Sequence, residues 1–402
     1  MFVLSLARLA LQAGQILALA LSFYHSLIVV AGYVRGRPQR PVVEPLPKFA
    51  AIVCARNEED VIARLIGDLR AQDLPAGHIQ VIAVAHNCTD GTAEVARAAG
   101  AEVIEITTKA AGKAHAIAAG AQAVRAGVDF VGIFDADSRV EPDFLRRLAP
   151  ATVGEVCVQA ETSALTAVRG PRGGFWRRAR NLFYWRPREA LGLGCTINGT
   201  GWFIRPALLR ELQPELRTVT EDLELTVLLA TAGKRVAFCS DAQVVIEEPH
   251  RFRSAVRQRT RWARGHFRVL RLLTPALARR AARGDLRALD LLIYVTLPTR
   301  LVTRTAVVAV ALLSFAGAPF GIGRRLAVAG VVSEWAVPAL VGLHSGLVPL
   351  RFGAMRLIAR DVVLSAAWFP IAFWALLTTN VRDWRPTPRQ HVEEEQDAAI
   401  HP

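Results

Sequence analysis

The sequence predicts an α/β catalytic domain with a mostly parallel sheet, flanked on both sides by transmembrane helices. Short β-prone runs alternate with helical patterns between about residues 49 and 134, and long uncharged stretches lie near both ends. The chain is also apolar as a whole, with 52% hydrophobic residues and a mean hydropathy of +0.28. Alternating strands and helices are typical of a parallel sheet covered on both faces.

The stretch Leu9–Val34 contains no formal charge. At about 1.5 Å per residue it can span a bilayer core of about 30 Å, and it is too long for the apolar core of a cleaved signal peptide. Arg35, Arg37 and Arg40 follow at once. The positive-inside rule therefore places the next residues in the cytosol.

The alternating segment provides the predicted sheet. Helical spacing of apolar residues across 61–69, and alanine-rich helices over Thr92–Ala99 and Gly112–Ala126, separate the β-prone runs. A sheet of this kind binds ligands at the carboxyl ends of its strands. The predicted strands are Phe49–Ala55, Gln80–Ala85, Glu102–Ile106 and Phe130–Phe134.

The C-terminal part is again apolar, and we expect three spans there with a fourth over Asp290–Val302. We predict an N-terminal helix and linker over 1–40, a cytosolic domain over 41–285 and membrane helices over 286–402, in a multi-pass protein of the inner membrane. An odd number of C-terminal spans would place the last arginines outside, so the side of the C-terminus stays open. The three expected spans are Ala306–Gly323, Leu326–Leu350 and Val362–Val381.

The charge balance is strongly basic, with a formal net charge of +14. No zinc-finger, homeodomain or RRM pattern accompanies it, which argues against nucleic acid and favours an anionic membrane surface or phosphorylated substrates. The cysteines show no CxxC spacing, which indicates reduced thiols rather than a zinc site. They are Cys54, Cys88, Cys157, Cys195 and Cys239.

Asp135-Ala136-Asp137 directly follows a predicted strand. Residues i and i+2 of an extended segment point the same way, so both carboxylates can bind a hard cation that also holds a substrate diphosphate. We therefore expect Mg²⁺ or Mn²⁺ at Asp135 and Asp137. An ordinary solvated turn is the alternative.

Thr220-Glu221-Asp222 precedes an apolar helical run. In one interpretation Thr220 caps that helix and the two acids complement its dipole. In the other, Asp222 is a general base at the start of the helix, with Glu221 beside it.

Gln258, Arg261 and Trp262 share one face of a basic helix. Arginine binds phosphate in a bidentate manner and tryptophan offers a flat surface for a sugar ring. The alternative is a basic amphipathic helix that rests on anionic lipid.

Lys109 and Lys113 flank Gly112 near the start of a helix, where cations oppose the dipole, so both are candidate phosphate ligands. Gly199-Thr200-Gly201 is either a plain turn or a small-residue platform for an acceptor.

Five motifs in this order and spacing resemble the inverting family 2 glycosyltransferases of the GT-A fold. The most similar group is the membrane synthases of cellulose, hyaluronan and poly-N-acetylglucosamine. The resemblance covers roughly residues 48–270. The motifs are Ala55-Arg-Asn-Glu-Glu59, Asn87-Cys-Thr-Asp-Gly-Thr92, Asp135-Ala-Asp137, Thr220-Glu-Asp222 and Gln258-Arg-Thr-Arg-Trp262.

The resemblance implies a role for each matching residue. Asp137, helped by Asp135, would bind the metal, and Asp222 with Glu221 would deprotonate the acceptor. Gly199, Thr200, Gly201 and Trp262 would bind the acceptor. The residues implied in donor binding are Ala55, Arg56, Asn57, Glu58, His86, Asp90, Lys113, Asp135, Ala136, Asp137, Gln258 and Arg261.

The chain departs from the family at one place. Ala85 and His86 stand where the family usually has two adjacent acids, one of which reads the nucleobase. Asp90 remains, so a UDP-linked donor is expected while base specificity stays open.

The leading interpretation is an exopolysaccharide synthase that extends a growing polysaccharide, with a second copy or an export subunit as possible partners. The first alternative is a lipid glycosyltransferase that adds one sugar to a ceramide-like or hopanoid-like acceptor. The second is a catalytically silent scaffold. Sugar identity and linkage are not determined by the sequence.

Overall fold

The computed structural model describes residues 2–108, 112–164, 175–216, 218–246, 252–296, 300–316, 324–344 and 368–379. The chain forms two compact units. The helical unit comprises Met1–Pro38, Ala179–Gly192 and Ile293–Phe369. The sheet unit comprises Gln39–Arg178, Leu193–Leu292 and Pro370–Pro402. Ala179–Gly192 thus belongs to the helical unit although it lies inside the predicted catalytic range.

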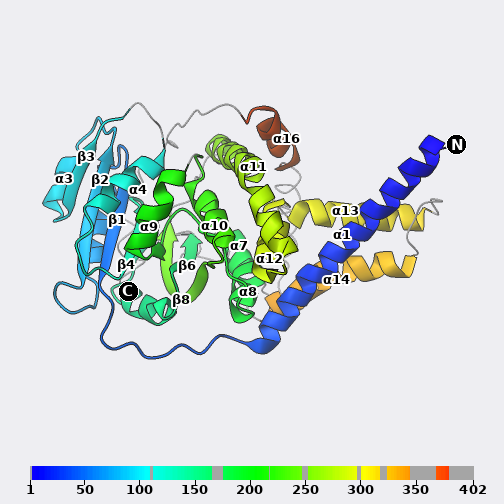
Figure 1. The fold of residues 1–402 in the computed structure, drawn as a ribbon, viewed down its shortest axis with the longest axis horizontal. Coiled ribbons are helices and arrows are strands. Elements are labelled where there is room, and N and C mark those ends of the chain that lie inside the picture. The colour runs from blue at the N-terminus through cyan, green and yellow to red at the C-terminus, as the bar shows by residue number, and fades with distance from the viewer. Residues whose placement is uncertain are drawn as a thin grey trace. The chain divides into compact units, whose positions relative to one another are not determined.

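The sheet unit is built on one eight-stranded sheet in the order β3-β2-β1-β4-β7-β6-β8-β5 (Figure 1). The first four strands along the chain are parallel, and β7 runs antiparallel to both β4 and β6. This confirms the predicted α/β class. The strands are β1 Phe49–Ala55, β2 Ile79–His86, β3 Glu102–Ile106, β4 Phe130–Asp135, β5 Arg139–Val140, β6 Cys157–Ala164, β7 Trp202–Ile204 and β8 Ala237–Ile246.

Helices cover both faces of this sheet. Val53 belongs to the same core as Leu65 of α2, whereas Ile52 contacts α4 on the opposite face. A Cβ at Gly120 of α4 would lie 2.6 Å from Ile52 Cγ2, so glycine permits this close approach. Between β1 and the basic helix, the α-helices are α2 Ile62–Arg70, α3 Thr92–Ala98, α4 Lys113–Gln122, α5 Phe144–Leu148, α7 Phe175–Arg180, α8 Arg186–Ala190, α9 Pro206–Leu212 and α10 Glu221–Thr231.

The basic helix α11 spans Phe252–Ala282, and α12 (Leu286–Thr296) and α16 (Trp368–Leu377) follow it along the chain. Arg264 Nε of α11 donates a hydrogen bond to Thr378 Oγ1, 2.9 Å away, just beyond α16.

The helical unit contains α1 (Phe2–Arg35), α13 (Arg300–Phe315) and α14 (Arg324–His344), which lie side by side (Figure 1). By length and hydropathy, Leu9–Arg35 and Arg324–Gly342 could each cross a membrane, and Thr303–Phe315 is a shorter apolar helix. The structure describes the predicted span Ala306–Gly323 as far as 316, Leu326–Leu350 as far as 344 and Val362–Val381 over 368–379, and the rest of each lies outside the described residues.

Polar side chains occupy the interior of the helical unit. Ser22 of α1 is fully buried and its Oγ donates to Glu334 Oε2 of α14 at 3.0 Å. Glu334 is also fully buried and pairs with Arg304 of α13 at 3.3 Å. The exposed positions carry large apolar side chains, such as Leu17 and Leu27 of α1. Apolar residues outside and hydrogen-bonded polar residues inside are typical of helices that face lipid.

Candidate active site

The carboxyl ends of β1, β2 and β4 meet at one edge of the sheet. Ala55 at the end of β1 is in register with Ala85 of β2, and Cys54 is in register with Asp135 at the end of β4. The strands that follow β1 along the chain, β2 and β3, lie on one side of it, and β4 lies on the other. The strand order therefore reverses at β1. A ligand of an open parallel sheet binds in such a crevice.

Two of the predicted donor loops brace each other at this edge. Asn57 has a φ of 57° and its Oδ1 accepts a hydrogen bond from Thr89 N at 2.9 Å. Glu58 N donates to Thr92 Oγ1 at 2.8 Å, and Asp90 Oδ1 accepts from Thr92 N at 3.2 Å. The side chains of Asn57 and Asp90 therefore hold the loops in place.

His86 is buried at the end of β2, with Nε2 2.9 Å from Thr108 Oγ1. Burial lowers the pKa of His86, and the neighbouring His115 and Arg56 lower it further. The imidazole is consequently neutral at physiological pH and presents both a donor and an acceptor nitrogen. Lys109 and the two residues after it lie outside the described part of the chain.

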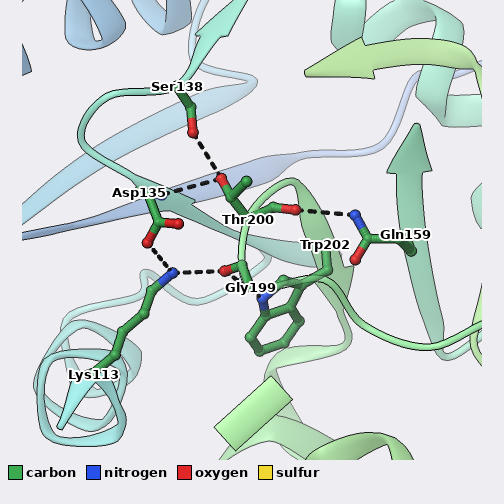
Figure 2. A network of polar contacts seen from close by, with 7 residues as sticks. All are labelled: Lys113, Asp135, Ser138, Gln159, Gly199, Thr200 and Trp202. Atoms are coloured by element: carbon green, nitrogen blue, oxygen red, sulfur yellow. Dashed lines mark hydrogen bonds and ion pairs between the residues drawn. The ribbon is translucent and has the colours of Figure 1, made fainter. Parts of the chain in front are cut away.

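Lys113 connects the end of β4 to the loop before β7. Its Nζ donates hydrogen bonds to Asp135 Oδ1 and to the Gly199 carbonyl, each at 2.6 Å (Figure 2). Burial acts to lower the pKa of Lys113, but the negative charges around it, with that of Asp135 foremost, outweigh burial and raise it. Lys113 is thus a charged ammonium held within the site.

Glu221 and Asp222 start α10 close to this group. If Gly199 carried a Cβ, that atom would lie 3.6 Å from Asp222 Oδ2 and 4.0 Å from Asp135 Oδ2. Both carboxylates therefore face the small volume that glycine leaves open. Thr226 Oγ1 donates to the Asp222 carbonyl at 2.8 Å and anchors the first turn.

The environment keeps these two acids weak. Burial, and then the charge of Asp222, raises the pKa of Glu221 to about 7. Burial also raises the pKa of Asp222, and the positive charges of Lys113 and Arg261 oppose that rise. Thr220 stands at the N-cap position, but its side chain makes no capping hydrogen bond; its Oγ1 lies 3.3 Å from Thr218 Oγ1.

The basic helix α11 is held against the start of α10. A Cβ at Gly265 would lie 2.3 Å from Thr220 Cγ2, so only glycine allows this contact. Arg261 is close enough to lower the pKa of Asp222. Gln258 is partly buried on the same helix, and Trp262 is 42% exposed.

A divalent cation fits this edge only if the substrate contributes ligands. Among the described residues, no group of three or more His, Cys, Asp or Glu side chains could hold a metal ion. Asp135, next to the space at Gly199, and Asp137, which follows the buried Ala136, provide two hard carboxylates at the end of β4. Such a pair suits a cation that completes its shell with phosphate oxygens.

Three contributors to the site were not predicted from the sequence. Cys54 lies next to Lys113 and Asp135, and burial raises its pKa to about 12, so it remains a thiol. Gln159 of β6 donates a hydrogen bond to the Thr200 carbonyl, and Ser138, just after β4, contacts the Thr200 hydroxyl. The sequence does not predict these contacts, because a polar residue within or just after a strand pattern does not indicate which distant loop it will bind.

An open, mostly parallel sheet, an acid pair at the end of β4 and a second acid pair at the start of α10 beside it are the features of a nucleotide-sugar-dependent glycosyltransferase of the GT-A fold. Residues 47–265 match the family described as "Glycosyltransferase like family 2". The match covers more than half of the chain, and the protein belongs to this family.

Similar proteins include both lipid and polysaccharide enzymes. The Beta-monoglucosyldiacylglycerol synthase of Synechocystis sp. is 28% identical over 238 residues, covering 56% of this chain and 48% of that protein. The Probable glucomannan 4-beta-mannosyltransferase 11 of Arabidopsis thaliana is 28% identical over 160 residues, covering 37% of this chain and 35% of that protein. The chain spans about half the length, or less, of these relatives.

Among solved structures, the fold is similar to mannosyltransferase PcManGT from Pyrobaculum calidifontis, determined in complex with GDP-Man and Mn²⁺. The TM-score is 0.57 at 20% identity, covering 91% of this chain and 99% of that one. This likeness concerns the fold and confirms the predicted GT-A class.

Proposed function

We propose that this glycosyltransferase transfers a single sugar, with inversion, from a nucleoside diphosphate sugar to the hydroxyl group of a membrane lipid. The observation that carries the chemistry is that Asp222 Oδ2 and Asp135 Oδ2 both border the space that a Cβ of Gly199 would occupy. Asp222 can receive the acceptor proton, while Asp135 can hold a cation that neutralises the departing diphosphate.

In this mechanism Asp222 takes the proton of the acceptor hydroxyl as its oxygen attacks the anomeric carbon. Attack occurs on the face opposite the nucleotide, the bond from that carbon to the diphosphate oxygen breaks, and the nucleoside diphosphate leaves. The raised pKa of Asp222 makes it a better base than an ordinary aspartate. Lys113 and Arg261 provide positive charge for the leaving group.

Asp135 and Asp137 would hold a Mg²⁺ or Mn²⁺ ion, which would neutralise charge on the donor diphosphate. The loops at Ala55–Glu58 and His86–Asp90 would bind the nucleoside. A neutral His86 can accept from or donate to a base edge, which is compatible with a UDP-linked donor. On α11, Gln258 would contact the donor and Trp262 would contact the acceptor.

Packing of the helical unit supports a lipid acceptor. Leu19, Val307 and Ala327 are buried between α1, α13 and α14, and a Cβ at Gly330 would lie 2.3 Å from Leu19 Cδ2. Over their described residues these three helices pack apolar side chains at their centre, which favours a compact bundle over a channel for a glycan. The similarity to a glucosyldiacylglycerol synthase supports the same choice.

The apolar exterior of α1, α13 and α14 supports a multi-pass protein. We place it in the inner membrane with the sheet unit in the cytosol, next to nucleotide-sugar pools. A homo-oligomer or an export subunit remains a prediction from the sequence.

The experiment is reconstitution in lipid nanodiscs with radiolabelled UDP- and GDP-sugars, followed by organic extraction and size separation. We expect one organic-soluble product that carries one sugar and does not lengthen with time. Adding diacylglycerol, ceramide or a hopanoid separately identifies the acceptor.

A polysaccharide synthase is the second candidate, favoured by the similarity to a glucomannan mannosyltransferase and by the motif order. A ladder of water-soluble, high-mass products in the same experiment would establish it and overturn the lipid proposal.

A further inference from the structure

We infer that Gln159 is a positioning residue for the reaction, because its amide sets the loop that aligns Asp135, Lys113 and Asp222. This inference rests on the proposed function of the same site. Gln159 lies inside β6, is fully buried and is in register with Trp202, the first residue of β7.

The loop before β7 meets only part of its hydrogen bonding through the backbone, where Thr200 N donates to the Asn198 carbonyl at 2.9 Å and Gly201 N to the Ile133 carbonyl at 2.8 Å. Gly199 and Gly201 have φ values of 78° and 67°, a left-handed conformation that turns neighbouring carbonyls out of the strand pattern. β7 pairs with its neighbours only from Trp202 to Ile204. Buried carbonyl and N–H groups ahead of that point need partners from elsewhere.

One side chain supplies partners for two further groups of the loop, the Asn198 N–H and the Thr200 carbonyl. Gln159 Nε2 donates to the carbonyls of Ala160 at 2.9 Å and Thr200 at 3.0 Å, with a longer contact of 3.3 Å to the Gly201 carbonyl, and Gln159 Oε1 accepts from Asn198 N at 2.8 Å. A primary amide can do this because it carries two donors and an acceptor on one rigid plane. Gln159 therefore contacts the loop at both ends, at Asn198 and at Gly201.

The pinned loop holds the reacting groups (Figure 2). Thr200 Oγ1 accepts from Asp135 N at 3.1 Å and lies 2.9 Å from Ser138 Oγ. The Gly199 carbonyl accepts from Lys113 Nζ and, at 3.2 Å, from Trp202 Nε1. Because Gly199 also faces Asp135 Oδ2 and Asp222 Oδ2, a shift of the loop changes the spacing of both carboxylates.

A second glutamine allows this role to be separated from simple core stability. Gln72, also buried, donates from Nε2 to the carbonyls of Asp68 at 3.0 Å and Glu141 at 2.7 Å, and accepts from Leu145 N at 2.9 Å. It thus makes an equivalent set of bonds, but around α2 and α5 rather than at the site. Replacing either residue by methionine removes the amide and keeps the approximate volume.

The test compares the full-length Gln159→Met and Gln72→Met variants in nanodiscs by nucleotide release and by thermal unfolding. Release is measured with the donor and acceptor that the wild type uses, so failure of the lipid proposal would leave this comparison intact. We expect similar losses in melting temperature, but a fall in kcat of about ten- to hundredfold for Gln159→Met alone. Gln159→Asn, which keeps an amide of shorter reach, should retain an intermediate kcat.

Thr200→Val, which removes the hydroxyl contact to Asp135, provides a double-mutant cycle with Gln159→Met. Since both changes act through one loop, their combined loss of kcat should be clearly smaller than the product of the single losses. Equal kcat in Gln159→Met and Gln72→Met, or fully multiplicative losses in the cycle, would overturn the inference. If Gln159→Met does not fold, the same criteria apply to Gln159→Asn.

Discussion

The Lys113 ammonium lies 2.6 Å from both Asp135 Oδ1 and the Gly199 carbonyl, and so ties the end of β4 to the loop before β7 (Figure 2). Lys113 itself stands at the start of α4. A cation there opposes the helix dipole. Its position is stabilised by Asp135, and the same charge is available to a donor phosphate.

Replacing Lys113 by methionine should lower turnover by about 10²-fold, since a buried positive charge at the leaving group is lost. Steady-state nucleotide release measures this. Lys234→Met, at an exposed lysine, is the control and should behave like the wild type. A Lys113→Met enzyme within threefold of the wild type would remove Lys113 from the mechanism.

Asp222→Asn should abolish transfer while nucleotide binding persists, because the amide keeps the shape of the side chain but cannot accept the proton. General-base catalysis typically contributes about 10²–10⁴-fold. Turnover and calorimetric binding of the nucleoside diphosphate are measured on the same preparation. A loss below tenfold would contradict the base assignment, and a misfolded variant would favour a structural role at the start of α10.

The rate should fall on the acidic side at a higher pH than for an ordinary aspartate. Asp222 must be deprotonated to act, and burial raises its pKa, so activity is lost as the pH falls through that raised value. The charge of Asp222 raises the pKa of Glu221 to about 7, so Glu221 takes up its proton first and is neutral on the acidic limb. Glu221→Gln should therefore leave the acidic limb in place, and a clear shift of that limb in Glu221→Gln would contradict this order of protonation.

Chelation should stop turnover, and Mg²⁺ or Mn²⁺ should restore it. Asp137→Asn should raise the metal concentration needed for half-maximal rate by more than about tenfold, because the site offers few protein ligands. Asp129→Asn is the control, since Asp129 lies just before β4, at the opposite end of the strand from Asp135. Full turnover by a metal-stripped enzyme in excess EDTA would disprove metal dependence.

Gly265→Ala should lower turnover by about tenfold, since its Cβ would collide with Thr220 and push α11 away from α10. Gly67→Ala is a matched control in α2, where nothing lies within 4 Å of the new Cβ. That change should instead stabilise the protein by up to ~1 kcal/mol through helix propensity. Normal activity in Gly265→Ala would mean that the contact between α10 and α11 is not needed for alignment.

The sequence was sufficient for much of the fold. The predicted strands Phe49–Ala55 and Glu102–Ile106 coincide with β1 and β3, and Asp135 ends β4 one residue beyond the predicted boundary. β1 is buried on both faces and is therefore a continuous apolar run, whereas β3 is an edge strand in which β-branched residues stand between two glutamates. Five short motifs in order then indicated the glycosyltransferase family, which the family match over 47–265 confirms.

The tertiary structure decided which of these residues meet. Lys113 and Gly199 are 86 positions apart, and Gln159 contacts a loop about 40 positions away. Asp135 and Asp222 likewise come from separate elements and meet at the space beside Gly199. Sequence patterns report the burial and local geometry of each element, because those depend on neighbours along the chain. Contacts across the sheet depend on strand order, register and positive-φ glycines, and these arise only when the elements pack together.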